Sequence, residues 1–189
     1  MSCNADFAEK RAIGRQGERV VEGWLQARGW WVIPSYDWSG ENGDKAPRMY
    51  SNSGRIVLPD LDTCKDGMRR WVEVKAYDHS PWNRKHKCNT HGIKRRHYFD
   101  YGRVHEQTGS EVWLAVIEQA MEAYDGDRVD TGVILLKTLF PSSDGYLPCQ
   151  CKACAAGQFA FCAAPQSDMV YFKREWFKEI TDAARSHVA

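Results

Sequence analysis

The chain has 189 residues, enough for one domain with an elaboration and a substantial buried core. Charged residues make up 27% and hydrophobic residues 43%, and a formal net charge of +1 excludes binding to nucleic acid through overall charge alone. No apolar run reaches the length of a transmembrane helix and the polar N-terminus lacks a secretory apolar region, so we expect a cytoplasmic protein with no membrane partner.

A helix followed by a strand is expected at the N-terminus. Residues 7–28 carry apolar side chains at helical spacing, and Gly29 is suited to end the helix. Glu18 lies on this helix, where a single charged residue is usually just solvated. Residues 30–36 are rich in aromatic and β-branched side chains, which predicts a strand.

A long loop and then a hairpin are expected next. Residues 37–54 contain Ser-Gly and Asn-Gly pairs and a proline, which predicts a loop that either binds substrate or merely connects. Residues 55–60 and 70–76 are expected to be strands. The Asp66-Gly67 pair between them favours a turn that joins the two.

This hairpin carries chemical groups on one face. Alternate residues of a strand share a face, so Glu73 and Lys75 point the same way while the neighbouring valines pack on the core. Asp60 and Asp62 are spaced in the same way, and the hairpin can bring Asp60 toward Glu73 and Lys75. Clustered carboxylates repel one another unless a cation lies between them, which predicts a Mg²⁺ or Mn²⁺ site for phosphodiester hydrolysis. The alternative is a surface hairpin with scattered charges.

Residues 79–97 form the most basic segment and lead into a second helix. The segment holds Arg84, Lys85, Lys87, Lys94, Arg95 and Arg96, interleaved with Trp82, His86 and His91. Such local density neutralises phosphates, although a run of charge is more often a solvated face. Residues 93–107 are expected to be helical, with Tyr98, Tyr101 and Val104 pointing inward.

Three further strands and a final helix are expected toward the C-terminus. Residues 111–118 form a nearly continuous apolar run typical of a buried strand, and residues 131–139 form a second candidate strand. Residues 169–172 are expected to be a short strand. It leads into a helix over residues 174–184 that packs through Trp176, Phe177 and Ile180.

Pro59-Asp60, followed after a short hairpin by Glu73-Val74-Lys75, resembles the signature of the PD-(D/E)XK nuclease superfamily, which includes restriction endonucleases and Holliday junction resolvases. The core of that family runs helix, three antiparallel strands, helix, strand, which is the order expected here over residues 7–118. The resemblance implies an α/β fold with a restriction-endonuclease-like core, in which helices flank a central mixed sheet.

The resemblance also implies roles for individual residues. Asp60 and Glu73 would bind the metal ion and Lys75 would be the catalytic lysine. Several families of this type carry a further acidic residue facing the metal where Glu18 lies. The helix after the catalytic strand packs beside the site in this fold, so Lys94 and Arg95 are candidates for contacts with backbone phosphates. Because two-strand cleavage in this superfamily often uses dimers, a homodimer is a further candidate assembly.

A cluster of cysteines forms the second chemical feature. Cys149, Cys151, Cys154 and Cys162 lie within fourteen residues, which predicts a structural Zn²⁺ site. Some nucleases of the resembled superfamily carry an iron-sulfur cluster instead, and Cys3 or Cys64 would then be the missing ligand. Free, partly buried thiols are the third alternative. His86, Cys88 and His91 have metal-ligand spacing too, but we favour a place for both histidines in the basic patch.

We therefore expect three regions: a nuclease core over residues 1–140, a cysteine-rich metal-binding loop over residues 141–168, and a C-terminal strand and helix over residues 169–189 packed on the core. The expected function is a Mg²⁺-dependent deoxyribonuclease, an endonuclease with DNA as its partner. The alternative is a module stabilised by a structural Zn²⁺ ion that binds nucleic acid or protein without cleaving it. No Ser-His-Asp signature or phosphate-binding glycine loop favours acyl transfer or nucleotide hydrolysis.

Overall fold

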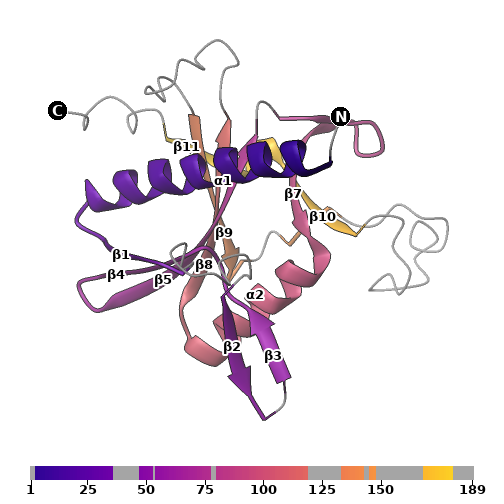
Figure 1. The fold of residues 1–189 in the computed structure, drawn as a ribbon. Coiled ribbons are helices and arrows are strands. Elements are labelled where there is room, and N and C mark those ends of the chain that lie inside the picture. The colour runs from indigo at the N-terminus through magenta and orange to yellow at the C-terminus, as the bar shows by residue number, and fades with distance from the viewer. Residues whose placement is uncertain are drawn as a thin grey trace.

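The computed structural model of the chain describes residues 3–35, 47–52, 54–77, 80–118, 133–142, 145–147 and 168–180, with side chains from residue 12 onward. Within these residues, a central six-stranded sheet carries α1 (Cys3–Gln26) on one face and α2 (Arg95–Thr108) on the other (Figure 1). Two smaller sheets lie beside it. Neither helix combines the length and apolar character needed to cross a membrane.

The central sheet has the strand order β1-β4-β5-β8-β9-β11. Its strands are β1 (Trp31–Pro34), β4 (Leu61–Lys65), β5 (Met68–Tyr77), β8 (Glu111–Glu118), β9 (Val133–Phe140) and β11 (Lys178–Ile180). Only β5 and β8 are parallel, and α2 lies in the crossover connection that parallel neighbours require. Within the central sheet, α1, β1, β4, β5, α2 and β8 follow the expected order of helix, three antiparallel strands, helix and strand, although β4 takes the place of the strand expected over residues 55–60.

Strand alternation divides the core into two layers. On β8, Val112, Leu114 and Val116 face the layer that contains α2, whereas Ala115 and Ile117 face the layer that contains α1. A strand buried on both faces reads as a continuous apolar run, which is why residues 111–118 are recognisable in the sequence. Each large side chain that is fully buried in these layers contributes about 1.5–3 kcal/mol to stability.

The hairpin that contains β5 is present, but its first strand lies later in the chain than residues 55–60. Asp66 and Gly67 form a two-residue turn with φ values of 50° and 78°, the geometry that asparagine, aspartate and glycine favour in tight hairpins. This turn pairs Lys65 with Met68, so β4 rather than the expected strand lies beside β5. Asp60 therefore directly precedes β4.

The loop expected over residues 37–54 contains a strand in its described part. β2 (Arg48–Ser51) pairs with β3 (Gly54–Val57) in a separate antiparallel ribbon. Met49 lies opposite Ile56, and both contribute to the core next to α2. Burial of these two side chains explains why the segment is regular although its turn residues favour a loop.

A third sheet joins the basic segment to the C-terminal part of the chain. Its order is β10 (Met169–Lys173), β7 (Cys88–Lys94) and β6 (Trp82–Asn83). β7 was not expected, and its extended backbone separates Lys87 from Lys94 by about 23 Å at about 3.3 Å per residue. The basic segment is therefore two clusters rather than one continuous patch.

The expected strand over residues 169–172 is confirmed, but the helix expected from Arg174 is wrong over its described part. A single 3₁₀ turn, η1 (Arg174–Trp176), is followed by β11, which pairs with β9 and extends the central sheet. Hydrogen bonding to an open sheet edge satisfies this backbone, and the short apolar pattern fits a strand as well as a helix. Residues 181–184 lie outside the described residues.

Candidate active site

Asp60 lies where β4 stops pairing with β5. The last pair in the register is Leu61 with Val72, so β5 continues beyond this point without β4 beside it. The carboxylate Oδ2 of Asp60 accepts a hydrogen bond from the backbone N–H of Val74 at 2.8 Å, which satisfies a donor that a continuing strand would have bonded. Asp60 is thereby held at this edge with only 6% of its surface exposed.

Glu73 and Lys75 extend from the same stretch of β5. Glu73 is 2% exposed and points to the side of the sheet covered by α2, where Tyr101 lies. The Lys75 ammonium forms an ion pair with Glu73 Oε1 and lies 4.0 Å from Asp60 Oδ2. The structure therefore brings Asp60, Glu73 and Lys75 together, as their spacing predicted.

Tyr101 of α2 is a member of this cluster that sequence reasoning placed only as a packing residue. Its hydroxyl donates a hydrogen bond to Glu73 Oε2, and the ring of His97 lies 6.0 Å from its ring. Burial lowers the pKa of His97, with Glu73 opposing that shift and Lys75 adding to it. Helical spacing predicted the inward direction of Tyr101. The signal for its polar role is that a buried tyrosine hydroxyl normally needs a partner.

Glu18 reaches the cluster from α1, on the opposite face of the sheet. Gly17 permits the close approach, because a Cβ at this position would lie 3.1 Å from the Cβ of Ala76 on β5. Burial raises the pKa of Glu18 to about 7, with Lys75 opposing and Glu73 adding to the shift. Glu18 is half-buried and within electrostatic range of Glu73 and Lys75, and its part in the site stays a prediction.

The cluster holds more negative than positive charge. Burial, with the Glu73 carboxylate, raises the pKa of Asp60 well above its usual range. Burial alone would lower the pKa of Lys75, but the Glu73 and Asp60 carboxylates outweigh it and raise that pKa. Three carboxyl groups thus share one ammonium, and a divalent cation would relieve their mutual repulsion.

These residues fit a hard cation that keeps much of its own water. Among the described residues, no three His, Cys, Asp or Glu side chains form a group that could hold a metal ion on their own. Mg²⁺ does not require such a cage, because it is usually bound by one or two carboxylates together with waters and substrate phosphates. Asp60 and Glu73 would be those two carboxylates.

Asp62 does not join the cluster, although the spacing Asp-x-Asp had suggested a shared face with Asp60. Its two carboxylate oxygens accept hydrogen bonds from Arg69 at 2.8 and 2.7 Å on β5. Asp60 lies outside the strand, so the alternation rule does not relate the two aspartates. Asp62 therefore has a separate structural role at the hairpin.

The substrate candidates Lys94 and Arg95 lie at the junction of β7 and α2. Lys94 is exposed and Arg95 is half-buried, with its guanidinium carbon 5.6 Å from the centre of the Phe99 ring. Lys94 also contributes to the lowered pKa of His97. His97 is therefore within electrostatic range of both Lys94 and the pair formed by Glu73 and Lys75.

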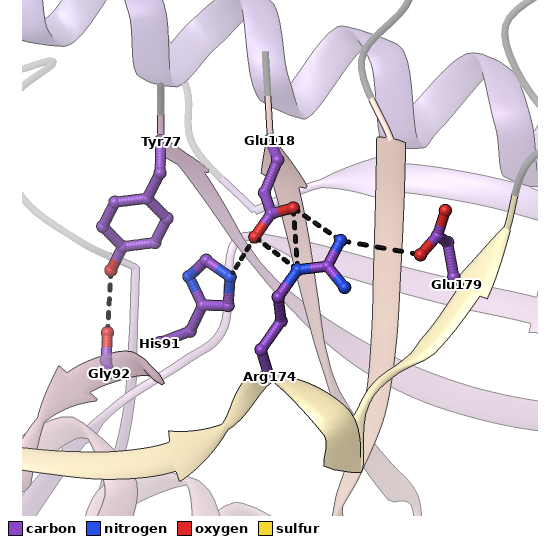
Figure 2. Close-up of polar contacts among 6 residues, drawn as sticks. All are labelled: Tyr77, His91, Gly92, Glu118, Arg174 and Glu179. Carbon is purple, nitrogen blue, oxygen red and sulfur yellow. Dashed lines mark hydrogen bonds and ion pairs between the residues drawn. The ribbon is translucent and has the colours of Figure 1, made fainter. Parts of the chain in front are cut away.

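His91 is not part of an exposed basic patch. Its Nε2 lies 2.7 Å from Glu118 Oε1. Arg174 bonds the same carboxylate and also forms an ion pair with Glu179 (Figure 2). Burial lowers the pKa of His91, so a neutral imidazole is favoured there. Glu118 lies opposite Tyr77 in the sheet register, so this network lies at the end of β5 and β8, two residues beyond Lys75.

The cysteine cluster lies outside the described residues, so zinc binding by Cys149, Cys151, Cys154 and Cys162 stays a prediction. Two other cysteines have described side chains: Cys64 is exposed on β4 and Cys88 is half-buried on β7, both as free thiols. Neither belongs to a metal-binding group within the described part of the chain. His86 is half-buried, and burial lowers its pKa.

No protein-family model matches the chain. No curated protein matches its sequence. Among solved structures, the fold is similar to Hjc, a Holliday junction resolvase from the archaeal hyperthermophile Archaeoglobus fulgidus, with 10% sequence identity and a TM-score of 0.46 over 87% of this chain and 91% of that chain. A functional assignment therefore depends on the site itself.

Proposed function

We propose that the chain is a metal-dependent nuclease that hydrolyses DNA phosphodiester bonds. The observation that supports this proposal is the convergence of Asp60, Glu73 and Lys75 at the edge of β5 that β4 leaves open, with Lys75 Nζ 4.0 Å from Asp60 Oδ2. Buried carboxylates that lie beside one lysine, among them Asp60 with its raised pKa, are typical of functional sites.

Each residue has a distinct part in this proposal. Asp60 and Glu73 would hold Mg²⁺ or Mn²⁺, and Glu18 would add negative charge from α1. When bound, the cation would supply Lewis acidity and lower the pKa of bound water. Lys75 orients the attacking water and stabilises negative charge on the phosphate, while Lys94 and Arg95 contact backbone phosphates.

A second candidate is a module that binds nucleic acid or protein without cutting it. One observation favours it: both oxygens of Glu73 already have protein partners, Tyr101 and Lys75. In the nuclease proposal, at least one of these contacts must change when the metal ion binds. In the binding module, they persist and keep the site closed.

Incubation of the purified protein with DNA separates the two candidates. Plasmid, linear duplex, single-stranded and branched DNA are each incubated with Mg²⁺, with Mn²⁺ and with EDTA. The nuclease proposal predicts cleavage that requires the metal ion. Binding without cleavage of any substrate favours the module, and elemental analysis of the same preparation for Zn and Fe tests the cysteine cluster independently.

A further inference from the structure

The ribbon formed by β2 and β3 has two faces of different character. Met49 and Ile56 lie opposite each other and pack on the core beside α2. Because alternate residues and directly paired residues share a face, Arg48, Tyr50 and Arg55 lie together on the other one. The ribbon projects from the body of the protein next to α2 (Figure 1).

This outer face, made of Arg48, Tyr50 and Arg55, is cationic and aromatic. Tyr50 is 71% exposed and lies directly across from Arg55, which is also exposed. Residues 47–58 include both arginines and no acidic residue. Neither arginine forms an ion pair with a carboxylate that the structure describes. A single exposed aromatic residue is ordinary, but an aromatic ring flanked by two guanidinium groups without a carboxylate is suited to bases and phosphates.

The ribbon is tied to the candidate active site in two ways. The backbone N–H of Val57 donates a hydrogen bond to Asp100 Oδ2 at 3.2 Å, and Asp100 precedes Tyr101, which bonds Glu73. In addition, the chain runs directly from β3 to Asp60. Asp60 is five positions after Arg55, a span of at most about 18 Å, or about five base-pair steps of about 3.4 Å.

We infer that the outer face of the ribbon binds unpaired nucleotides of the substrate. Tyr50 stacks on a base, and Arg48 and Arg55 contact the phosphates on either side of it. Stacking needs a base face that is open, which duplex DNA does not offer along its length. The preferred substrate is therefore a strand that is single or splayed near a duplex, as at a branch or fork. This inference builds on the proposed nuclease function and names its substrate class.

Binding without cleavage tests the inference. Fluorescence anisotropy in EDTA is measured with a single strand, a duplex and a forked DNA of related sequence. We expect the full chain to bind the fork and the single strand more tightly than the duplex. Tyr50→Ala and Tyr50→Leu should each weaken binding to these two by about tenfold while duplex binding is unchanged, and Tyr50→Phe should retain it.

Trp31→Ala is the matched control, because Trp31 is an exposed aromatic residue on a different strand, 77% exposed on β1. It should leave all three affinities unchanged. Thermal unfolding should show that the Tyr50 variants remain folded. Equal binding by wild type and Tyr50→Leu, or equal losses on fork and duplex, would overturn the inference.

Cleavage assays in Mg²⁺ distinguish this inference from the proposed function. If the protein binds forks through Tyr50 but cleaves no DNA, the inference about the ribbon stands and the nuclease proposal is wrong. If the protein cleaves DNA equally well with and without the Tyr50 ring, the nuclease proposal stands and the inference about the ribbon is wrong.

Discussion

The Asp60 carboxylate accepts a hydrogen bond from the Val74 backbone N–H at 2.8 Å, one residue beyond Glu73. The same side chain therefore completes the edge of β5 and contributes charge to the candidate metal site. The hydrogen bond and the negative charge of Asp60 can be tested separately by substitution, because asparagine retains an oxygen acceptor and loses the charge.

Asp60→Asn should leave the metal-free protein at least as stable as wild type, whereas Asp60→Ala should destabilise it. The alanine leaves the Val74 N–H without its acceptor, at a cost of about 1–3 kcal/mol. Urea unfolding in EDTA at pH 8 measures both free energies of unfolding. Equal stability of the two variants would show that the hydrogen bond contributes nothing.

Tyr101→Phe should reduce both stability and metal-dependent cleavage. Without the hydroxyl, the buried Glu73 oxygen loses a donor, which costs about 1–3 kcal/mol of unfolding free energy. Tyr98→Phe is the matched control, because Tyr98 is a buried tyrosine on the same helix that packs against Phe140 and Phe172. Cleavage by Tyr101→Phe at the rate of Tyr98→Phe would exclude a positioning role for the hydroxyl.

Stability of the metal-free protein should fall as pH rises. The pKa of Glu18 is about 7 in the folded protein against 4.5 as its ordinary value, so the folded state binds more protons in this interval. The free energy of unfolding therefore decreases between about pH 4.5 and 7, and the buried Asp60 adds in the same direction.

Glu18→Gln should weaken this pH dependence, and Mg²⁺ should raise the melting temperature of wild type at pH 8. Glu106→Gln is the control, because Glu106 is an exposed glutamate on α2 and is not among the groups that shift the pKa of Glu18. Melting temperatures measured from pH 4.5 to 8 with and without Mg²⁺ provide the test. A Glu18→Gln profile identical to that of wild type would contradict the raised pKa.

Arg174→Met should loosen the C-terminal strands. The Arg174 guanidinium donates hydrogen bonds to Glu118 Oε1 at 3.1 Å and to Glu118 Oε2 at 3.0 and 2.8 Å, and these bonds join η1 to the end of β8. Charged hydrogen bonds of this kind contribute about 1.5–3 kcal/mol. Lys173→Met removes a neighbouring exposed ion pair with Glu175 and should cost less than about 1 kcal/mol. Hydrogen exchange in β10 and β11 should rise only in the Arg174 variant; similar exchange in both variants would contradict this.

Periodicity predicted the elements whose environment is uniform along their length. The two-residue alternation placed Glu73 and Lys75 on one face, and the apolar run over residues 111–118 matches β8. Periodicity failed where a few long-range contacts determine the secondary structure. β2 forms because Met49 and Ile56 meet over α2, and residues 178–180 form a strand because β9 offers an open edge. Tyr101 was recognised as buried, but its bond to Glu73 depends on tertiary placement that no local pattern contains.

The central claim is tested most directly by comparing Asp60→Asn with Asp62→Asn in a Mg²⁺-dependent cleavage assay. The two substitutions make the same chemical change two residues apart, and Asp62 is bonded to Arg69 outside the cluster. We predict that Asp62→Asn cleaves DNA at the wild-type rate while Asp60→Asn is slower by at least about 100-fold, the loss typical of removing one charge-stabilising group. Equal rates for the two variants, or loss of activity only in Asp62→Asn, would contradict the account.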